Sequence, residues 1–289
     1  MYFDEEVILD LRLNILNQYV DYFVIVESTY NHKGEKRNLK FDIKKFSNFK
    51  KKIIYKVYNE QPAKILSIDK NDSEGEKSRK YIVNAYYREN NQRNFISKGL
   101  INANDDDLIL ISDVDEIPNL KDLKLQNIKN NIIIFEQKMF YYKLNLLYED
   151  FIWQGSKGVK KKLFKSPQWL RNIKGRKYPK WRVDTLFSKK KYSNLFFVKN
   201  GGWHFTCLRT PEELERKLLN FAHHYEFEES GLKLNDIKKL IIEKRVMYDH
   251  TVDQKGYKWS GKSILKNFNV KLLPDHVFLN LDKYSNWLD

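Results

Sequence analysis

The sequence has a single cysteine, Cys207. One cysteine excludes an internal disulfide and any zinc site built from cysteines. No uninterrupted apolar run is long enough to cross a bilayer, because charged residues interrupt every candidate within about 18 residues. The first ten residues are acidic, whereas a secretory leader begins with basic residues. These absences lead us to expect a soluble, cytoplasmic protein.

Several catalytic signatures are also missing. Neither phosphate-binding glycine pattern, G-x-x-x-x-G-K-[ST] or G-x-G-x-x-G, occurs, and the nucleophile pattern G-x-S-x-G is absent as well. No internal repeat or low-complexity linker interrupts the chain. With 289 residues and 42% hydrophobic content, the chain can bury a large core. We therefore expect one domain over residues 1–289.

Basic residues outnumber acidic ones by 53 to 38, which gives a formal net charge of +15. Such a charge attracts nucleic acid, acidic membrane surfaces and phosphorylated small molecules alike. The densest basic run lies between residues 157 and 191 and is interleaved with tryptophan and tyrosine. Three interpretations fit this run: a nucleic-acid surface, a cleft for a diphosphate or a sugar, and a solvated basic surface.

Helices and strands alternate in the first part of the sequence. Apolar spacing predicts a helix over 4–18 and a strand over 22–27, then a helix–strand pair over 42–57. A loop over 59–78 precedes a long helix over 78–97 and a strand over 108–111. This alternation predicts an α/β fold with a mostly parallel sheet flanked by helices, in which ligands bind at the carboxyl ends of the strands.

Downstream, short apolar runs predict strands over 132–135, 139–142, 159–164 and 195–198. The segment Thr210-Pro-Glu-Glu213 is a capping box with proline at the first helical position, so we expect a helix from there to about residue 224. Another helix is expected over 236–246. The chain should thus end in a helical extension.

A cluster of carboxylates follows the strand over 108–111. The segment DLILISDVDEIP, residues 107–118, places Asp113, Asp115 and Glu116 within four positions. Side chains alternate along an extended chain, so Asp113 and Asp115 share one side and can bind Mg²⁺ or Mn²⁺ together with a diphosphate. A bare D-x-D is also common on solvated surfaces, but its position at the end of a strand favours a function.

One histidine has an unusual setting. His204 lies between Trp203 and Phe205, after a pair of glycines. A histidine among apolar residues is commonly a hydrogen-bonded core residue, and it can also complete a carboxylate-rich metal site through a neutral imidazole nitrogen. Both roles stay open for His204.

Six stretches share their order and their residues with one enzyme family. They are LRLNILNQYVDYFVIVES (11–28), NHKGEKR (31–37), ENNQRN (89–94), DDLILISDVDEIP (106–118), WQGSK (153–157) and GGWHFTCLRTPEELERKLLNFAHHYE (201–226). In these stretches the chain resembles glycosyltransferase family 17, the group of the β-1,4-mannosyl-glycoprotein N-acetylglucosaminyltransferase that adds bisecting N-acetylglucosamine.

The resemblance implies a GT-A-like, Rossmann-type fold with a nucleotide-sugar half over about 1–118 and an acceptor half over about 119–289. It implies an inverting, metal-dependent transfer from a UDP-sugar, with UDP-N-acetylglucosamine as donor and Mn²⁺ or Mg²⁺ as cofactor. The residues that it assigns to the metal are Asp113, Asp115 and His204. Those that it assigns to the donor are Glu27, Arg93, Asp113, Trp153 and Lys157.

The animal enzymes of that family are anchored in the Golgi membrane and carry several cysteines around the Trp-His segment. Because this sequence shows one cysteine and no anchor, we expect a glycan or lipid-linked saccharide acceptor, used in the cytoplasm. The positive charge would then favour peripheral contact with an anionic membrane, and nucleic acid is not expected as a partner.

The general base of an inverting transfer is a carboxylate, and the sequence offers two candidates, Glu116 and Asp184. Glu116 also fits a structural role, accepting main-chain hydrogen bonds at the turn before Pro118. Two other functions fit the same residues: a metal-dependent nuclease or phosphotransferase, and a basic nucleic-acid-binding protein without catalysis.

Overall fold

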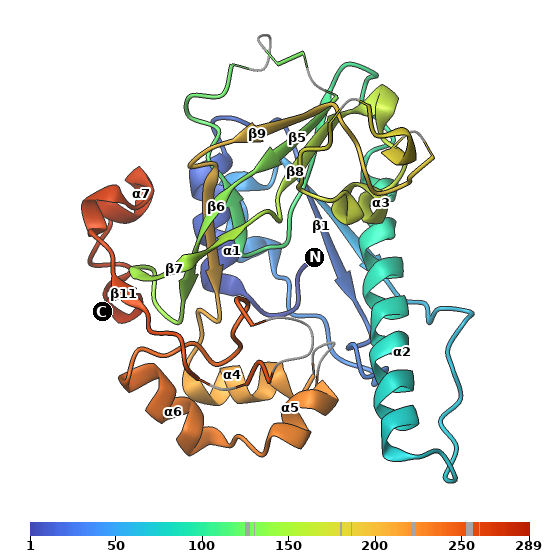
Figure 1. Cartoon of the computed structure of the whole chain (residues 1–289). Coiled ribbons are helices and arrows are strands. Elements are labelled where there is room, and N and C mark those ends of the chain that lie inside the picture. Colours follow the sequence, from blue (N-terminus) through green and yellow to red (C-terminus); the bar gives the residue numbers. More distant parts are fainter. Residues whose placement is uncertain are drawn as a thin grey trace.

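The computed structural model describes residues 1–289 except 125–127, 130, 180, 186, 221–223, 253–256 and 260. Within this described part the strands form three sheets (Figure 1). The first pairs β1 (Phe23–Ser28) with β2 (Ile53–Tyr58). The second has the order β3 (Leu108–Ile111), β8 (Lys157–Lys160), β5 (Ile132–Phe135) and β9 (Leu195–Val198). The third has the order β11 (Lys266–Asn267), β7 (Leu146–Trp153), β6 (Gln137–Tyr141), β10 (Gly202–Thr206) and β4 (Glu116–Pro118).

The strand directions correct the expectation of one mostly parallel sheet. The pairs β1–β2, β5–β9 and β10–β6 are parallel, whereas β8 runs antiparallel to both of its neighbours, β3 and β5. The pairs β6–β7 and β10–β4 are antiparallel as well. Only residues 142–145 connect β6 to β7, which is too short for the crossover that a parallel pair needs. The fold is therefore α/β with mixed sheets.

The helices flank these sheets. They are α1 (Glu6–Leu16), α2 (Glu74–Phe95), α3 (Pro167–Asn172), α4 (Pro211–Leu218), α5 (His224–Ser230), α6 (Leu234–Ile242) and α7 (Asp275–Phe278). In Figure 1, α2 stands beside β1, and α4 to α6 gather at the opposite end from β5 and β9. A 3₁₀ helix, Ile43–Phe49, replaces the helix expected before β2.

Several helix boundaries differ from the sequence prediction, among them those of α6, which covers 234–242 where 236–246 was expected. Helix α2 begins four residues before the expected start at residue 78, because Ser73 and Glu76 form a reciprocal capping box at its start. Helix α4 starts as predicted at the Thr210 capping box but ends at Leu218, and α5 begins separately at His224.

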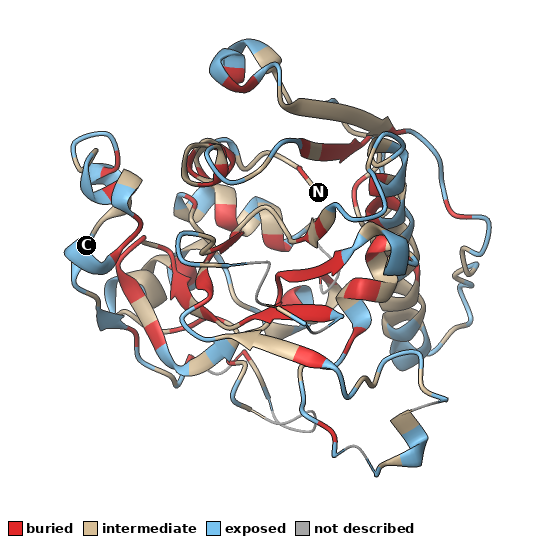
Figure 2. Ribbon diagram, turned by 90° about the horizontal axis from the view of Figure 1, so that it is seen from above, coloured by how far each residue is buried: buried red, intermediate tan, exposed pale blue. Residues whose placement is uncertain are grey.

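Three apolar clusters hold the described elements together. One surrounds α1 and includes Leu11 and Leu13, which are fully buried. A second packs α4 to α6 against β6 and β7, and a third lies beneath β3, β5 and β8. Figure 2 shows the buried residues concentrated on the central strands, with exposed residues on the outer helices and loops. Among the described residues, none of the helices is long and apolar enough to cross a membrane.

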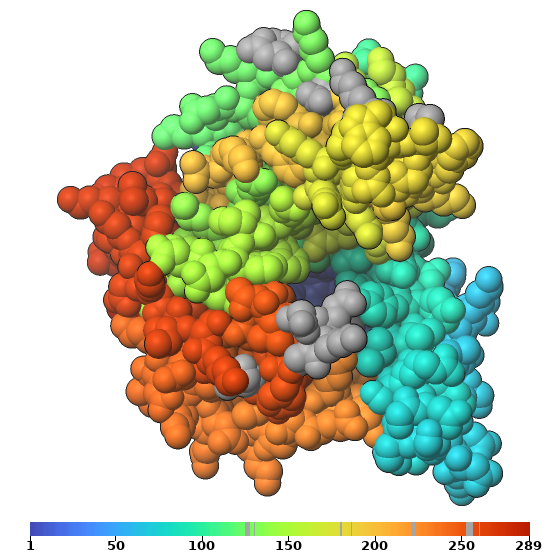
Figure 3. All heavy atoms as spheres, viewed as in Figure 1, coloured from blue at the N-terminus to red at the C-terminus, as the bar shows by residue number. Residues whose placement is uncertain are grey.

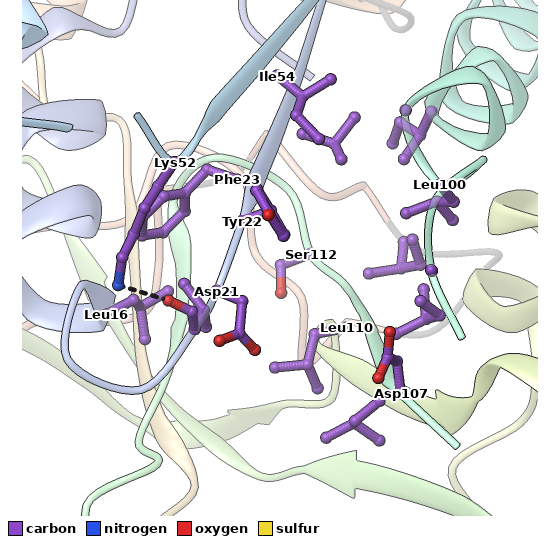
Figure 4. Close-up of a pocket in the computed structure, with 18 of the residues that line it drawn as sticks. Leu16, Asp21, Tyr22, Phe23, Lys52, Ile54, Leu100, Asp107, Leu110 and Ser112 are labelled. Atoms are coloured by element: carbon purple, nitrogen blue, oxygen red, sulfur yellow. Dashed lines mark hydrogen bonds between the residues drawn. The ribbon is translucent and has the colours of Figure 1, made fainter. Parts of the chain in front are cut away.

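A cavity of about 1200 Å³ separates β1 from β3, which belong to different sheets (Figure 4). Aliphatic side chains such as Leu16 and Leu110 line much of it, and Lys52 lies at its edge, where its Nζ donates to the Val20 main-chain oxygen at 2.8 Å. Ser112 and Val114 also line this cavity, whereas the carboxylates between and after them do not. The alternation of the 112–115 segment thus directs its acidic residues away from the aliphatic space.

Gly202 provides a test of how β10 meets β4. Its φ of +127° is unfavourable for other residues, and an added Cβ would lie 2.1 Å from the Ile117 main-chain oxygen. We expect Gly202→Ala to lower the free energy of unfolding by more than about 2 kcal/mol in urea denaturation. Gly75→Ala is the control, because a Cβ at Gly75 in α2 meets nothing within 4 Å and should be neutral or slightly stabilising. Equal stability of the two variants would contradict this view of the β4–β10 junction.

Candidate active site

A buried arginine joins two carboxylates of the acidic cluster. Arg171 donates to Asp113 Oδ2 at 2.8 Å and to both carboxylate oxygens of Glu116 at 2.7 and 2.5 Å. Glu116 is fully buried and also accepts hydrogen bonds from the Trp153 indole N–H at 2.5 Å and the Asp113 main-chain N–H at 2.9 Å. On the other side, Arg93 lies 3.2 Å from Asp113 Oδ1. Two guanidinium groups therefore neutralise two of the three carboxylates.

Local structure places each of these arginines. Arg171 lies in the last turn of α3, a helix that starts with Ser166 as N-cap and proline at its first position. The end of α3 is held by Lys157 of β8, whose Nζ donates to the main-chain oxygens of Arg171 at 2.6 Å and Ile173 at 2.5 Å. Arg93 lies in the last turn of α2, where Glu89, one helical turn earlier, accepts its hydrogen bond at 2.6 Å.

The pKa shifts follow from this pairing. Burial disfavours the charged form of Asp113, but Arg171 and Arg93 outweigh burial and hold the pKa of this carboxyl well below its usual range. Burial likewise opposes the charge of Arg171, and Asp113 and Glu116 outweigh it, so the pKa of the Arg171 guanidinium is raised. A third arginine, Arg12 of α1, donates to the main-chain oxygens of Asp113 and Glu116 and fixes the backbone of the cluster.

The third carboxylate has a different partner. Asp115 Oδ2 lies 3.6 Å from His204 Nε2, and both side chains are largely buried. Burial works against the charged form of Asp115, but His204 outweighs it, so the pKa of Asp115 is lowered. The other imidazole nitrogen of His204, Nδ1, is buried and has no hydrogen-bond partner, while the ring stacks on Trp153 with centroids 4.7 Å apart. Among the described residues, no guanidinium forms an ion pair with Asp115, which is left beside His204.

These groups gather at one side of the molecule. Figure 3 shows a hollow bordered by α2, by the strands around β7 and by the C-terminal segments, with the N-terminal residues at its base. Burial lowers the pKa of the Met1 amino group, and nearby Asp113 opposes that effect, so the cluster lies next to this base. The aliphatic cavity between β1 and β3 lies behind it, because Met1 and Arg12 line that cavity too.

Most of the residues singled out in the sequence come together here. Asp113, Asp115, Glu116, Arg93, Trp153, Lys157 and His204 belong to one connected set of contacts. The contacts of four residues bear on the roles expected for them: Glu27, Asp184, Glu116 and Asp113.

Glu27 does not face the hollow with a free carboxylate. It is fully buried and accepts hydrogen bonds from Arg37 at 2.9 Å, from Tyr55 at 2.8 Å and from the main-chain N–H groups of Lys40 and Phe41. The Glu27 carboxylate therefore holds the loop after β1 against the strand. Both of its oxygens accept hydrogen bonds within the protein, so neither is free to bind a nucleotide-sugar.

The two candidate bases are not placed for that role in this geometry. Glu116 has no exposure, and its oxygens are occupied by Arg171, Trp153 and a main-chain N–H, which matches its structural alternative. Asp184 lies in the exposed 3₁₀ turn Val183–Thr185 and pairs with Arg182 at 2.8 Å and Lys191 at 2.7 Å. Arg182 and Lys191, its ion-pair partners in the described part of the chain, lie outside the Asp113 cluster.

The sequence patterns did not predict a role for Arg171 in the site. It lies within the basic run 157–191, for which a solvated surface was one interpretation. That interpretation does fit part of the run, since Trp181 is 79% exposed, but Lys157 and Arg171 are directed inward. The available signal was the Ser166-Pro167 helix start, which predicts a short helix that carries Arg171 toward the core.

The side chains of the acidic cluster differ in whether they can bind a divalent cation. The described residues contain no group of three or more histidine, cysteine, aspartate or glutamate side chains that could hold a metal ion alone. Both oxygens of Asp113 are engaged by guanidinium groups, so Asp113 does not fit as a ligand in this arrangement. Asp115 and His204 do fit, because Mg²⁺ and Mn²⁺ commonly use one or two protein ligands and complete their shell with substrate phosphates.

Comparison with known families gives one match. The family model described as glycosyltransferase family 17 matches residues 1–288, essentially the whole chain. Comparisons with curated proteins and with solved structures find no significant match.

Removing Arg171 should be far more costly than removing an exposed arginine. In Arg171→Ala, Glu116 stays buried without its main cation, so we expect the free energy of unfolding to fall by about 3–5 kcal/mol. Arg182→Ala is the matched control, because its partner Asp184 is exposed and the change should cost about 1 kcal/mol or less. Chemical denaturation measures the free energy of unfolding of both variants. Similar losses of stability in the two would contradict a large contribution from the Arg171 ion pairs.

Lys157 should give the protein a distinctive pH dependence. Burial, with a smaller contribution from Arg171, lowers the pKa of Lys157 to about 7, whereas an unfolded lysine has a pKa near 10.4. Between pH 7 and 9 the folded state therefore binds fewer protons than the unfolded state, so stability rises with pH. We expect the wild type to gain about 2 kcal/mol more over this interval than Lys157→Met. Identical pH dependence of the two proteins would contradict the shifted lysine.

Proposed function

The chain belongs to glycosyltransferase family 17, and on that premise we propose that it moves N-acetylglucosamine from a UDP-sugar to a glycan or lipid-linked acceptor. The transfer inverts the anomeric centre and forms a β-linkage. The proposal rests on how the carboxylates of the acidic cluster are paired. Arginines neutralise Asp113 and Glu116, whereas Asp115 lies beside His204.

Asp115 and His204 would hold the Mn²⁺ or Mg²⁺ that the family implies. Their ligand atoms lie 3.6 Å apart, and the two side chains come from different elements, the turn after β3 and strand β10. When bound, the cation supplies Lewis-acid stabilisation of the departing diphosphate. A carboxylate with a neutral imidazole suits Mn²⁺ somewhat better than Mg²⁺, which prefers oxygen ligands.

Arg93 and Arg171 contribute fixed positive charge beside the same place. Both are largely buried, and both are ordered by several hydrogen bonds before any substrate binds. Pre-oriented charges of this kind stabilise a developing diphosphate leaving group without reorganisation during the reaction. Asp113 therefore acts as a positioning residue, because it holds the two guanidinium groups at one point.

The net charge of the chain supports a phosphate-containing acceptor at a membrane surface. The net charge of +15 attracts anionic lipid head groups, which is where a lipid-linked saccharide in the cytoplasm would lie.

Donor binding gives the first test. We expect UDP-N-acetylglucosamine with Mn²⁺ to raise the melting temperature of the wild type and to be slowly hydrolysed with release of UDP. Asp115→Asn should remove the Mn²⁺-dependent part of the shift and lower UDP release at least about 100-fold. Asp106→Asn is the control, because Asp106 is an exposed aspartate paired with Lys160 and Lys162.

The outcome also separates the alternative functions. A wild type whose melting temperature no UDP- or GDP-sugar changes, with or without Mn²⁺, would count against glycosyl transfer. Cleavage of a polynucleotide that needs Asp115 would instead indicate a nuclease, and salt-sensitive nucleic-acid binding that ignores Asp115 would indicate a binding protein.

A further inference from the structure

A row of aromatic rings leads away from the Asp115–His204 pair. It begins at Trp153, which stacks on His204, and continues to His250, whose ring centroid lies 5.6 Å from that of Trp153. His250 also lies 5.1 Å from Phe151 and 5.0 Å from Tyr248. Trp153 and Phe151 come from β7, whereas Tyr248 and His250 come from the segment after α6. We call these four residues the aromatic wall.

The aromatic wall differs from the apolar core in two ways. All four of its side chains keep part of their surface accessible, whereas the core rings beside them, such as Tyr148, are fully buried. Burial, with smaller contributions from the neighbouring His204 and Lys258, lowers the pKa of His250 to about 4, so this ring is neutral at physiological pH. The wall therefore presents neutral aromatic faces, which suit a partly apolar ligand.

A buried aspartate fixes the segment that carries half of the wall. Asp249 is 3% exposed and accepts hydrogen bonds from the hydroxyls of Tyr148, Thr251 and Ser263, each at 2.6 Å, and from the Thr251 main-chain N–H at 2.9 Å. These bonds tie the segment to β7 and to the chain near residue 263. His250, which follows Asp249, is thus held against Phe151 and Trp153, and Tyr248, which precedes Asp249, is held against His250 before any ligand binds.

Helix α2 forms the opposite side of the hollow. Tyr86, Glu89 and Arg93 recur at the spacing of one helical face, and Tyr86 is 47% exposed. Burial raises the pKa of Tyr86, and Glu89 and Tyr248 add to this effect, so Tyr248 lies near this face of α2. Figure 3 shows the hollow between α2 and the C-terminal segments.

The two sides therefore differ in chemistry. The side formed by α2 and α3 carries the guanidinium groups of Arg93 and Arg171, which suit phosphate oxygens. The aromatic wall extends from Trp153 in the other direction, and the cations beside it lie over ring faces, Arg171 over Trp153 at 6.0 Å and Lys258 over Tyr248 at 5.5 Å. A diphosphate at the arginines leaves the aromatic faces for a neutral group, and a pyranose ring packs its C–H face on aromatic rings while its hydroxyls stay hydrated.

We propose that the aromatic wall is the binding platform for the acceptor's pyranose ring, with Asp249 as the residue that positions it. This assignment rests on the proposed glycosyl transfer, because it is the acceptor sugar that must reach the Asp115–His204 pair. Uracil, the other flat group in such a reaction, is the competing occupant.

Binding of simple sugars tests the platform without any reaction. The probes are methyl β-pyranosides of glucose, galactose, mannose and N-acetylglucosamine, measured by saturation-transfer NMR on the full chain, with UDP titrated separately. We expect at least one pyranoside to bind the wild type, and His250→Ala to weaken that binding about threefold to tenfold. His250→Phe should restore the affinity because it keeps the aromatic face. His276→Ala is the matched control, since the His276 ring lies against Tyr284 of the C-terminal region and, among the described residues, makes no ring contact with the wall.

The outcomes separate the platform from the donor site. Pyranoside affinity that falls several-fold more than UDP affinity in His250→Ala supports the platform. Equal affinity in wild type and His250→Ala, or absence of pyranoside binding at millimolar concentration while UDP binds, would overturn it. UDP affinity that falls while pyranoside affinity does not would assign the wall to the uracil. A wild type that binds pyranosides but no UDP would keep the platform and refute the proposed donor.

Discussion

The ion-pair bridge from Arg171 to Asp113 and Glu116 is the interaction on which the site depends. A fully buried carboxylate is tolerated only when charge and hydrogen bonds compensate it, and Glu116 obtains both from Arg171, Trp153 and a main-chain N–H. The same arginine joins α3 to the turn after β3. The acidic cluster is therefore stable before any cation or nucleotide binds.

This bridge divides the acidic segment by function. Asp113 and Glu116 pair with the arginines, and Asp115 lies beside His204, where the two would hold the proposed cation. Around this centre the hollow has a cationic side and an aromatic side, so the diphosphate and the sugar of the proposed reaction would each meet groups of matching character. The proposed transfer would take place where the two sides meet, at Asp115 and His204.

Much of the site could be predicted from the sequence, because its residues follow strand ends and helix caps. Asp113 and Asp115 after β3, and His204 within a stretch typical of the family, were found in this way. The arrangement of the sheets could not be predicted, because β7 and β8 have no clear alternation and their antiparallel pairing depends on partners distant in sequence. The roles of Arg171 and His250 could not be predicted for the same reason. An arginine in a basic run and a lone histidine are recognised as site residues only when packing places them beside a carboxylate or a tryptophan.

The most direct test of this division is the position of the cation. Crystals grown with UDP and Mn²⁺ can be measured at a wavelength where manganese scatters anomalously, which locates the ion independently of the protein. We expect the anomalous peak at Asp115 and His204, with Arg171 still bonded to Asp113 and Glu116. A peak on Asp113 with Arg171 displaced, or UDP bound without any manganese peak, would contradict the account.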